Sequence, residues 1–100
     1  MQNQLLLYGA NGYTGKLIAK LAATYNLQPI LAGRTEANIK PLAAELQLPY
    51  RIIDLDNKEQ LENALSAVKL VLHAAGPYVY TAKQMIEACL QTGVHYIDIN

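Results

Sequence analysis

The sequence predicts an α/β domain built on a doubly wound parallel sheet of five strands with four helices. Short apolar runs alternate with amphipathic stretches along the chain, which is typical of a parallel sheet covered by helices on both faces. A glycine-rich turn after the first apolar run, combined with right-handed crossovers, favours the strand order 3-2-1-4-5. The alternation alone is also compatible with the order 2-1-3-4-5, but the glycine spacing argues against that alternative.

The apolar runs set the expected boundaries of each element. Strands are expected over residues 4–8, 30–32, 50–55, 68–75 and 95–99. Helices are expected over residues 15–25, in the stretch after Thr35, over residues 57–66 and from Thr81 onward. Pro41 lies inside the second of these helices. Because proline suits a first turn and breaks a helix interior, that helix is expected to begin near Ile39 or Lys40.

Local signals mark the ends and the buried faces of the helices. Asp56 with Glu59, and Thr81 with Gln84, have the spacing of capping boxes, and Gly93 suits a C-terminal cap. Apolar residues at helical spacing are expected to face the sheet. For the four helices in turn these are Leu17, Ile18, Leu21, Ala22 and Tyr25; Ile39, Leu42, Ala43 and Leu46; Leu61, Ala64 and Leu65; and Ala82, Met85, Ile86, Cys89 and Leu90.

Composition limits the classes of partner. The chain has 100 residues, 52% of them hydrophobic and 16% charged, so residues 1–100 are expected to form one domain with a packed core. Eight basic and eight acidic residues give a formal net charge of zero, which argues against binding to nucleic acid or to an anionic membrane. Cys89 has no second cysteine for a disulfide and no secretory signal is evident, so the cytoplasm is the expected location.

The turn after the first strand carries the strongest functional signal. Gly9, Gly12 and Gly15 are spaced by threes between an apolar run and an amphipathic run. Where a buried strand turns sharply into a helix, backbone N–H groups and the helix dipole attract phosphate. Glycine there leaves room for a pyrophosphate and for a tight strand–helix crossing. We therefore expect a dinucleotide to be held by the N–H groups of Asn11, Gly12, Tyr13 and Thr14, with the Thr14 hydroxyl as a further donor; the alternative is an ordinary turn without a ligand.

Arg34 is the second informative residue. It lies 19 residues after Gly15, just past the expected second strand, where an acidic residue would bind the ribose 2′-OH of NAD. A guanidinium group instead matches a 2′-phosphate and can stack on adenine, and Gly33 leaves room for that phosphate. The expected cofactor is therefore NADP(H), with NAD(H) less favoured. Glu36 weakens this interpretation because it could neutralise Arg34, and a solvated arginine is the alternative.

Two further segments follow expected strands, at the sheet edge where this fold binds ligands. Asp54 ends the third strand and is a candidate contact on the adenine side, although a turn or cap role is more common for such an aspartate. Ala75, Gly76 and Pro77 leave the fourth strand beside the point where a dinucleotide crosses the sheet. Small residues there would let the backbone run along the ribose and the nicotinamide.

No catalytic side chain and no metal site are expected within these residues. His73 falls in an apolar strand and is expected to be a hydrogen-bonded core or edge histidine. Cys89 is expected to pack in the core. The two histidines and the cysteine lack metal-ligand spacing, and no Ser/His/Asp arrangement is evident.

Four segments, taken together and in order, resemble the saccharopine dehydrogenase-like oxidoreductases, in the branch that includes the trans-acting enoyl reductases. They are residues 9–15, 31–34, 74–78 and 87–98. The resemblance extends from residue 5 to residue 100 and implies a Rossmann domain that binds NADP, with hydride transfer by the complete enzyme. It supports as cofactor contacts Gly9, the residues from Asn11 to Gly15, Arg34, and the residues from Ala75 to Pro77. Asn11 departs from the family, whose members commonly carry threonine there.

Length is the larger departure from the family. Relatives continue into a second domain that forms the substrate pocket, and without it this chain is expected to be incomplete for catalysis. The alternatives are a regulatory or redox-sensing module that binds dinucleotide without turnover, and a remnant that binds nothing. The fifth strand, with Tyr96, Ile97 and Ile99, is expected to be an exposed edge, and such edges pair with other chains. We therefore expect self-association through this strand.

Overall fold

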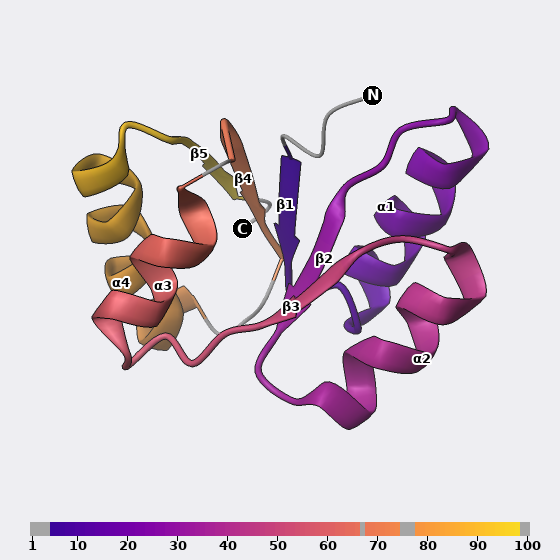
Figure 1. The fold of residues 1–100 in the computed structure, drawn as a ribbon, viewed down its shortest axis with the longest axis horizontal. Helices are drawn as coiled ribbons and strands as arrows, with labels where there is room; N and C mark the ends of the chain where they lie inside the picture. The colour runs from indigo at the N-terminus through magenta and orange to yellow at the C-terminus, as the bar shows by residue number, and fades with distance from the viewer. Residues whose placement is uncertain (1–4, 67, 75–77, 99–100) are drawn as a thin grey trace.

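The computed structural model describes residues 5–66, 68–74 and 78–98, and strands alternate with helices throughout (Figure 1). The strands are β1 (Leu5–Tyr8), β2 (Ile30–Gly33), β3 (Tyr50–Ile52), β4 (Leu70–His73) and β5 (His95–Asp98). The helices are α1 (Tyr13–Thr24), α2 (Glu36–Leu46), α3 (Lys58–Leu65) and α4 (Tyr78–Thr92). Every expected element is present, with ends that shift by a few residues.

The strands pair in parallel in the order β3-β2-β1-β4-β5. This confirms the predicted order and excludes the alternative 2-1-3-4-5. Because crossovers are right-handed, helices on the way to β3 and helices on the way to β5 cover opposite faces of the sheet. Figure 1 shows α1 and α2 on one side and α3 and α4 on the other. The direction reverses between β1 and β4, and doubly wound sheets bind ligands beyond the strand ends at that point.

Alternate residues of β1 point to opposite faces of the sheet and join two separate cores. Leu6 and Tyr8 pack with buried side chains of α3 and α4, whereas Leu7 packs with buried side chains of α1 and α2. Both faces of the central strand are therefore apolar, as expected for a buried parallel strand. Within the described ranges, no helix combines the length and the apolar character needed to cross a lipid bilayer.

Helix α2 begins at Glu36 and contains Pro41 in its interior, so the predicted start near Ile39 or Lys40 is wrong. Proline at this position lacks the N–H that would bond to the carbonyl of Ala37. Ala37 and Pro41 are both exposed, so water can bind that carbonyl instead. The buried side chain of Ile39 holds the helix against the sheet.

The predicted N-cap of α3 is one residue too early. Asn57 caps this helix, because its Oδ1 accepts a hydrogen bond from the N–H of Gln60 at 3.0 Å. Asp56 instead accepts a hydrogen bond from Nε2 of Gln84 at 3.4 Å. Asparagine and aspartate are equally good N-caps, so adjacent residues of these two types leave the sequence signal ambiguous.

The predicted start of α4 is also wrong, because the helix begins at Tyr78 and includes Thr81. A threonine followed three residues later by glutamine also occurs inside helices, so the spacing alone does not fix a start. The other end of the helix is as predicted. Gly93 has a φ of 74°, the left-handed conformation that glycine supplies after a helix.

Helix α1 begins at Tyr13, slightly before the predicted residue, and it turns a different face to the sheet from the predicted one. Leu17, Leu21 and Tyr25 are 51%, 55% and 74% exposed, respectively, so three of the five predicted core positions are wrong. The helix packs so closely against the sheet that small residues form its buried face: Gly15, Ala19 and Ala22.

Helix α4 shows a smaller error of the same kind. Met85 and Cys89 are buried as predicted, and Ala88 is buried beside them. Ile86 and Leu90 are 38% and 78% exposed, so their predicted inward orientation is wrong. These two residues lie four positions apart and share a helix face that points away from the sheet.

Candidate dinucleotide-binding site

The chain turns from β1 into α1 through a conformation that glycine adopts readily. Gly9 has a φ of 85°, in the left-handed region that other residues rarely occupy. Its N–H donates to the carbonyl of Ala32 in β2 at 2.8 Å. The N–H of Gly12 donates to the carbonyl of Gly9 at 3.1 Å. The first bond ties the turn to the carboxyl end of β2, and the second closes the turn itself.

Gly15 and Gly12 are glycines for different physical reasons. A Cβ on Gly15 would meet the carbonyl oxygen of Gly9 and would lie 2.9 Å from Cα of Ala10, so strand–helix packing excludes any side chain there. A Cβ on Gly12 would lie 3.5 Å from the same oxygen, which is ordinary contact. Packing within the protein therefore does not require glycine at position 12.

The opening of α1 suits an anionic group. The first turn of α1 contains no acidic residue, and its N-cap, Gly12, provides no side-chain hydrogen bond, unlike Asn57 of α3. The residues predicted to hold the pyrophosphate are all exposed. Backbone N–H groups at such a terminus attract phosphate, so the residues present here fit a dinucleotide. These residues are Asn11, Gly12, Tyr13 and Thr14.

Arg34 and Asp54 flank the same end of the sheet. Arg34 directly follows β2, Asp54 follows β3, and both are exposed. Both charges act on the hydroxyl of Tyr8 at the end of β1. The pKa of Tyr8 is raised, mainly because burial disfavours the charged phenolate, while Arg34 lowers it and Asp54 raises it. The two predicted residues therefore follow neighbouring strands, β2 and β3, at the same edge of the sheet.

Glu36 has a partner other than Arg34. Its Oε2 accepts a hydrogen bond from the hydroxyl of Tyr50 at 3.0 Å. This bond is the main reason that the pKa of Tyr50 is raised, because it favours the protonated phenol. The Glu36 carboxylate, which could have neutralised Arg34, is therefore hydrogen bonded to Tyr50 of β3 instead.

Asp54 takes the turn role that the sequence left open beside cofactor contact. Its Oδ1 accepts a hydrogen bond from the N–H of Asp56 at 3.0 Å, and its own N–H donates to Oε1 of Gln60 at 2.8 Å. The side chain is still exposed at the sheet edge, so contact with an adenine nucleoside stays a prediction.

The remaining candidates, Ala75, Gly76 and Pro77, lie outside the described residues. The preceding residue, Ala74, donates its N–H to the carbonyl of Tyr8 at 2.8 Å.

The sequence did not single out a hydrogen-bonded chain at the other end of this edge. Nδ1 of His73 lies 2.8 Å from the hydroxyl oxygen of Tyr96, and that hydroxyl donates to Oδ2 of Asp98 at 3.2 Å. His73 is hydrogen bonded and fully buried, as predicted. Strand alternation places Tyr96 and Asp98 on one face, but only the pairing of β4 with β5 brings His73 to them.

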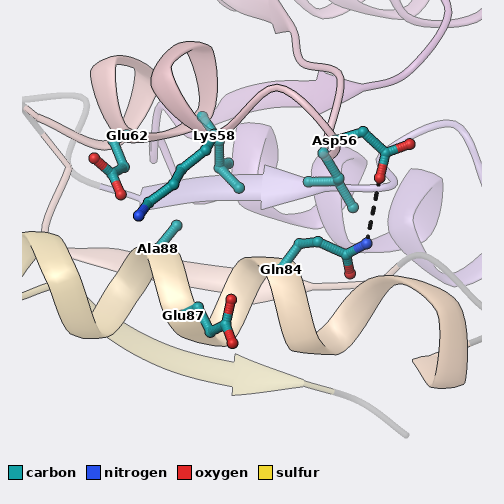
Figure 2. A pocket seen from close by; sticks show the side chains of 8 residues that line it. Asp56, Lys58, Glu62, Gln84, Glu87 and Ala88 are labelled. Atoms are coloured by element: carbon teal, nitrogen blue, oxygen red, sulfur yellow. Dashed lines mark hydrogen bonds between the residues drawn. The ribbon is translucent and has the colours of Figure 1, made fainter.

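A separate pocket of about 170 Å³ lies between α3 and α4 (Figure 2). Lys58, Glu62 and Glu87 contribute charged side chains to it, and Asp56 bonds Gln84 at one end. None of the predicted cofactor residues lines this pocket.

Cys89 and the possible metal ligands were the remaining candidates for chemistry. Burial raises the pKa of the Cys89 thiol to about 11, which suppresses the reactive thiolate. In the described part of the chain, no three His, Cys, Asp or Glu side chains are grouped to hold a metal ion.

Residues 5–100 match the family described as the saccharopine dehydrogenase NADP binding domain. The chain belongs to this family, and it is a dinucleotide-binding domain of the kind found in saccharopine dehydrogenase-like oxidoreductases. The trans-acting enoyl reductase of Mycobacterium leprae is 32% identical over 102 residues, which cover 95% of this chain and 24% of that protein. The saccharopine dehydrogenase-like oxidoreductase of Mus musculus is 27% identical over 114 residues, covering 95% of this chain and 27% of that protein.

Solved structures show the same Rossmann-like fold. Saccharopine dehydrogenase (L-Glu forming) from Saccharomyces cerevisiae has a TM-score of 0.84 at 19% identity, over 97% of this chain and 21% of that chain. The triphenylmethane reductase of Citrobacter sp., solved with NADP(H), has a TM-score of 0.80 at 22% identity, over 96% of this chain and 37% of that chain. The chain spans about a quarter of the length of the relatives named above.

Proposed function

We propose that this chain binds NADP(H) in preference to NAD(H) and serves as the cofactor domain of an oxidoreductase that transfers hydride. The observation that carries the proposal is the exposed, uncapped opening of α1, where Gly15 brings the helix against β1. The pyrophosphate would be held by the N–H groups of this opening. When bound, the cofactor supplies the hydride, and the protein supplies its binding and orientation.

Arg34 supports the preference for NADP(H). Its side chain is exposed just past β2, on the side of β1 where an adenosine half would lie. The neighbouring carboxylate of Glu36 is bonded to Tyr50, so the guanidinium group can bind a 2′-phosphate in a bidentate manner.

Calorimetric titration with NADPH and NADH tests this proposal. The wild-type chain is expected to bind NADPH more tightly, and Arg34→Gln is expected to weaken NADPH binding by about tenfold, because a charged hydrogen bond is lost, while NADH binding changes little. Arg51→Gln is the matched control, because Arg51 is an exposed arginine of β3 that bonds the carbonyl of Tyr50. Equal affinity of the wild type for both cofactors, or no binding of either, would refute the preference.

The complete reaction is proposed to need more protein than these residues. The relatives are about four times as long as the matched region, and a hydride donor must be held against a substrate. We propose that residues beyond such a cofactor domain form the substrate pocket, and that the protein acts in the cytoplasm, where its lone cysteine stays reduced.

We also propose self-association through β5. This strand ends the sheet order, and its Ile97 is 51% exposed. Ile97 pairs in register with Leu72, which packs against the core beneath α1 and α2. The exposed apolar side chain therefore lies on the sheet face that α1 and α2 cover farther along, next to a strand edge that can pair with a second copy.

A further inference from the structure

His73 has a costly position for a polar side chain. Its side chain is polar but fully buried, and no other polar side chain among the described residues is. It lies in the core between the sheet and helices α3 and α4. Burying an imidazole stabilises a fold less than burying an apolar side chain of similar size. The burial also lowers the pKa of His73, an effect that the charge of Asp98 partly opposes. Hydrogen bonding reduces this cost, which directs attention to what His73 is bonded to.

The hydrogen-bonded chain leads from this buried position to the surface. Tyr96 is half-buried and Asp98 is exposed. The tyrosine hydroxyl has one proton and donates it to the carboxylate of Asp98 at 3.2 Å. Its oxygen also lies 2.8 Å from Nδ1 of His73, and the imidazole tautomer that carries its proton on Nδ1 would donate to it. The tyrosine hydroxyl therefore lies between the buried imidazole of His73 and the exposed carboxylate of Asp98.

The register of the sheet places these three hydrogen-bonded side chains at the carboxyl edge. Tyr8 of β1, His73 of β4 and Asp98 of β5 are successive partners across the strands. Adjacent strands are about 4.8 Å apart, so β5 lies roughly 10 Å from the turn that follows β1. Arg34 and Asp54 lie on the opposite side of β1, after β2 and β3.

This arrangement defines two halves of the edge. With the pyrophosphate at the opening of α1 and the 2′-phosphate at Arg34, the second nucleoside of a dinucleotide must extend toward β4 and β5. Asp98 is exposed at this edge, and a carboxylate offers about four lone-pair sites to hydrogen-bond donors. The N–H of a carboxamide and the hydroxyls of a ribose are suitable donors.

We propose that Asp98 binds the nicotinamide riboside half of the cofactor as a hydrogen-bond acceptor, and that Tyr96 and His73 are positioning residues that orient its carboxylate. This inference rests on the proposed function, because it needs a dinucleotide in the assigned direction. It adds a contact for the half of the cofactor that carries the reactive carbon.

The experiment compares two ligands on the same variants by calorimetric titration. NADPH carries both halves, whereas adenosine 2′,5′-bisphosphate carries the adenine and the 2′-phosphate without the nicotinamide. Asp98→Asn is expected to weaken NADPH binding by about tenfold, as the loss of a charged hydrogen bond does, and to leave the bisphosphate affinity unchanged. Tyr96→Phe keeps the carboxylate but loses its orientation, and is expected to weaken NADPH binding about threefold.

A matched control and a spectroscopic readout complete the design. Asp56→Asn removes an exposed carboxylate that lines the pocket between α3 and α4 and is expected to change neither affinity. Nitrogen NMR of His73 is expected to show protonated Nδ1 in the wild type and a changed Nδ1 signal in Tyr96→Phe. Circular dichroism checks that each variant is folded before its affinities are compared.

The outcomes separate the two proposals. If Asp98→Asn binds NADPH as the wild type does, or loses both ligands to the same extent, the role of Asp98 is refuted while the proposed function stands. If the wild type binds the bisphosphate and NADPH equally tightly, no second half is recognised and the inference is again overturned. A wild type that binds neither ligand overturns both proposals.

Discussion

Gly15 matters for both the fold and the candidate site because it has no Cβ. Its missing Cβ lets α1 approach the turn after β1, where a Cβ would meet the backbone of Gly9 and Ala10. Because α1 lies so close to the sheet, only small residues fit on its buried face. The same approach places the N-terminal opening of the helix at the sheet edge. Gly15 therefore determines both the helix packing and the position of the groups proposed to bind phosphate.

Gly15→Ala is expected to destabilise the domain by about 3 kcal/mol, because backbone atoms cannot move aside as flexible side chains do. Thermal unfolding followed by circular dichroism measures this. Gly12→Ala is the control for glycine loss in the same turn. Its Cβ makes only ordinary contact with Gly9, so stability should change by about 1 kcal/mol or less, while NADPH binding weakens. Equal destabilisation by the two variants would contradict the different roles assigned to these glycines.

The helices differ at their N-terminal ends: neither α1 nor α2 has a side-chain cap, but only α2 carries an acidic residue, Glu36, in its first turn. Asn57 caps α3 with its own side chain, whereas the opening of α1 has no such bond and faces solvent. An uncapped opening with exposed residues and no acidic side chain leaves its N–H donors accessible to an anionic group.

Asn57→Ala is expected to lower the free energy of unfolding by about 1 kcal/mol, since an N-cap hydrogen bond to Gln60 is lost. NADPH affinity should change little, because the cap bond contacts neither the opening of α1 nor Arg34. Urea unfolding and calorimetric titration measure the two effects. A loss below about 0.3 kcal/mol would show that Asn57 does not act as the cap.

The element order, the sheet order and the glycine turn could all be predicted from the sequence, because each depends on local periodicity and on general handedness rules. The orientation of α1 could not. The amphipathic pattern placed Leu17 and Leu21 in the core, but close packing at Gly15 excludes large side chains from that face. The chain of His73, Tyr96 and Asp98 was missed for a related reason, since it forms only when β4 and β5 pair in register.

In the described part of the molecule, β5 forms one edge of the sheet. Helices α1 and α2 and helices α3 and α4 lie on opposite faces (Figure 1), and β5 remains at the edge with Ile97 exposed. Net charge is zero, so no net electrostatic repulsion separates two copies. Both features favour association.

Size-exclusion chromatography with light scattering should show a dimer or larger species at high protein concentration. Ile97→Lys is expected to shift it toward monomer, because a charge on an edge strand opposes pairing. Leu90→Lys is the control, since Leu90 is 78% exposed on α4 and lies off the strand edge. A wild-type monomer at high concentration, or an equal effect of both variants, would rule out association through β5.

The most direct test of cofactor binding follows the backbone amides during a titration of the ¹⁵N-labelled chain with NADPH. The largest chemical-shift changes are expected for the amides from Asn11 to Gly15 and for Arg34, because phosphate groups would bind beside them. Shifts confined to the pocket lined by Lys58 and Glu62 (Figure 2), or no shifts at a large excess of NADPH, would contradict binding at the opening of α1.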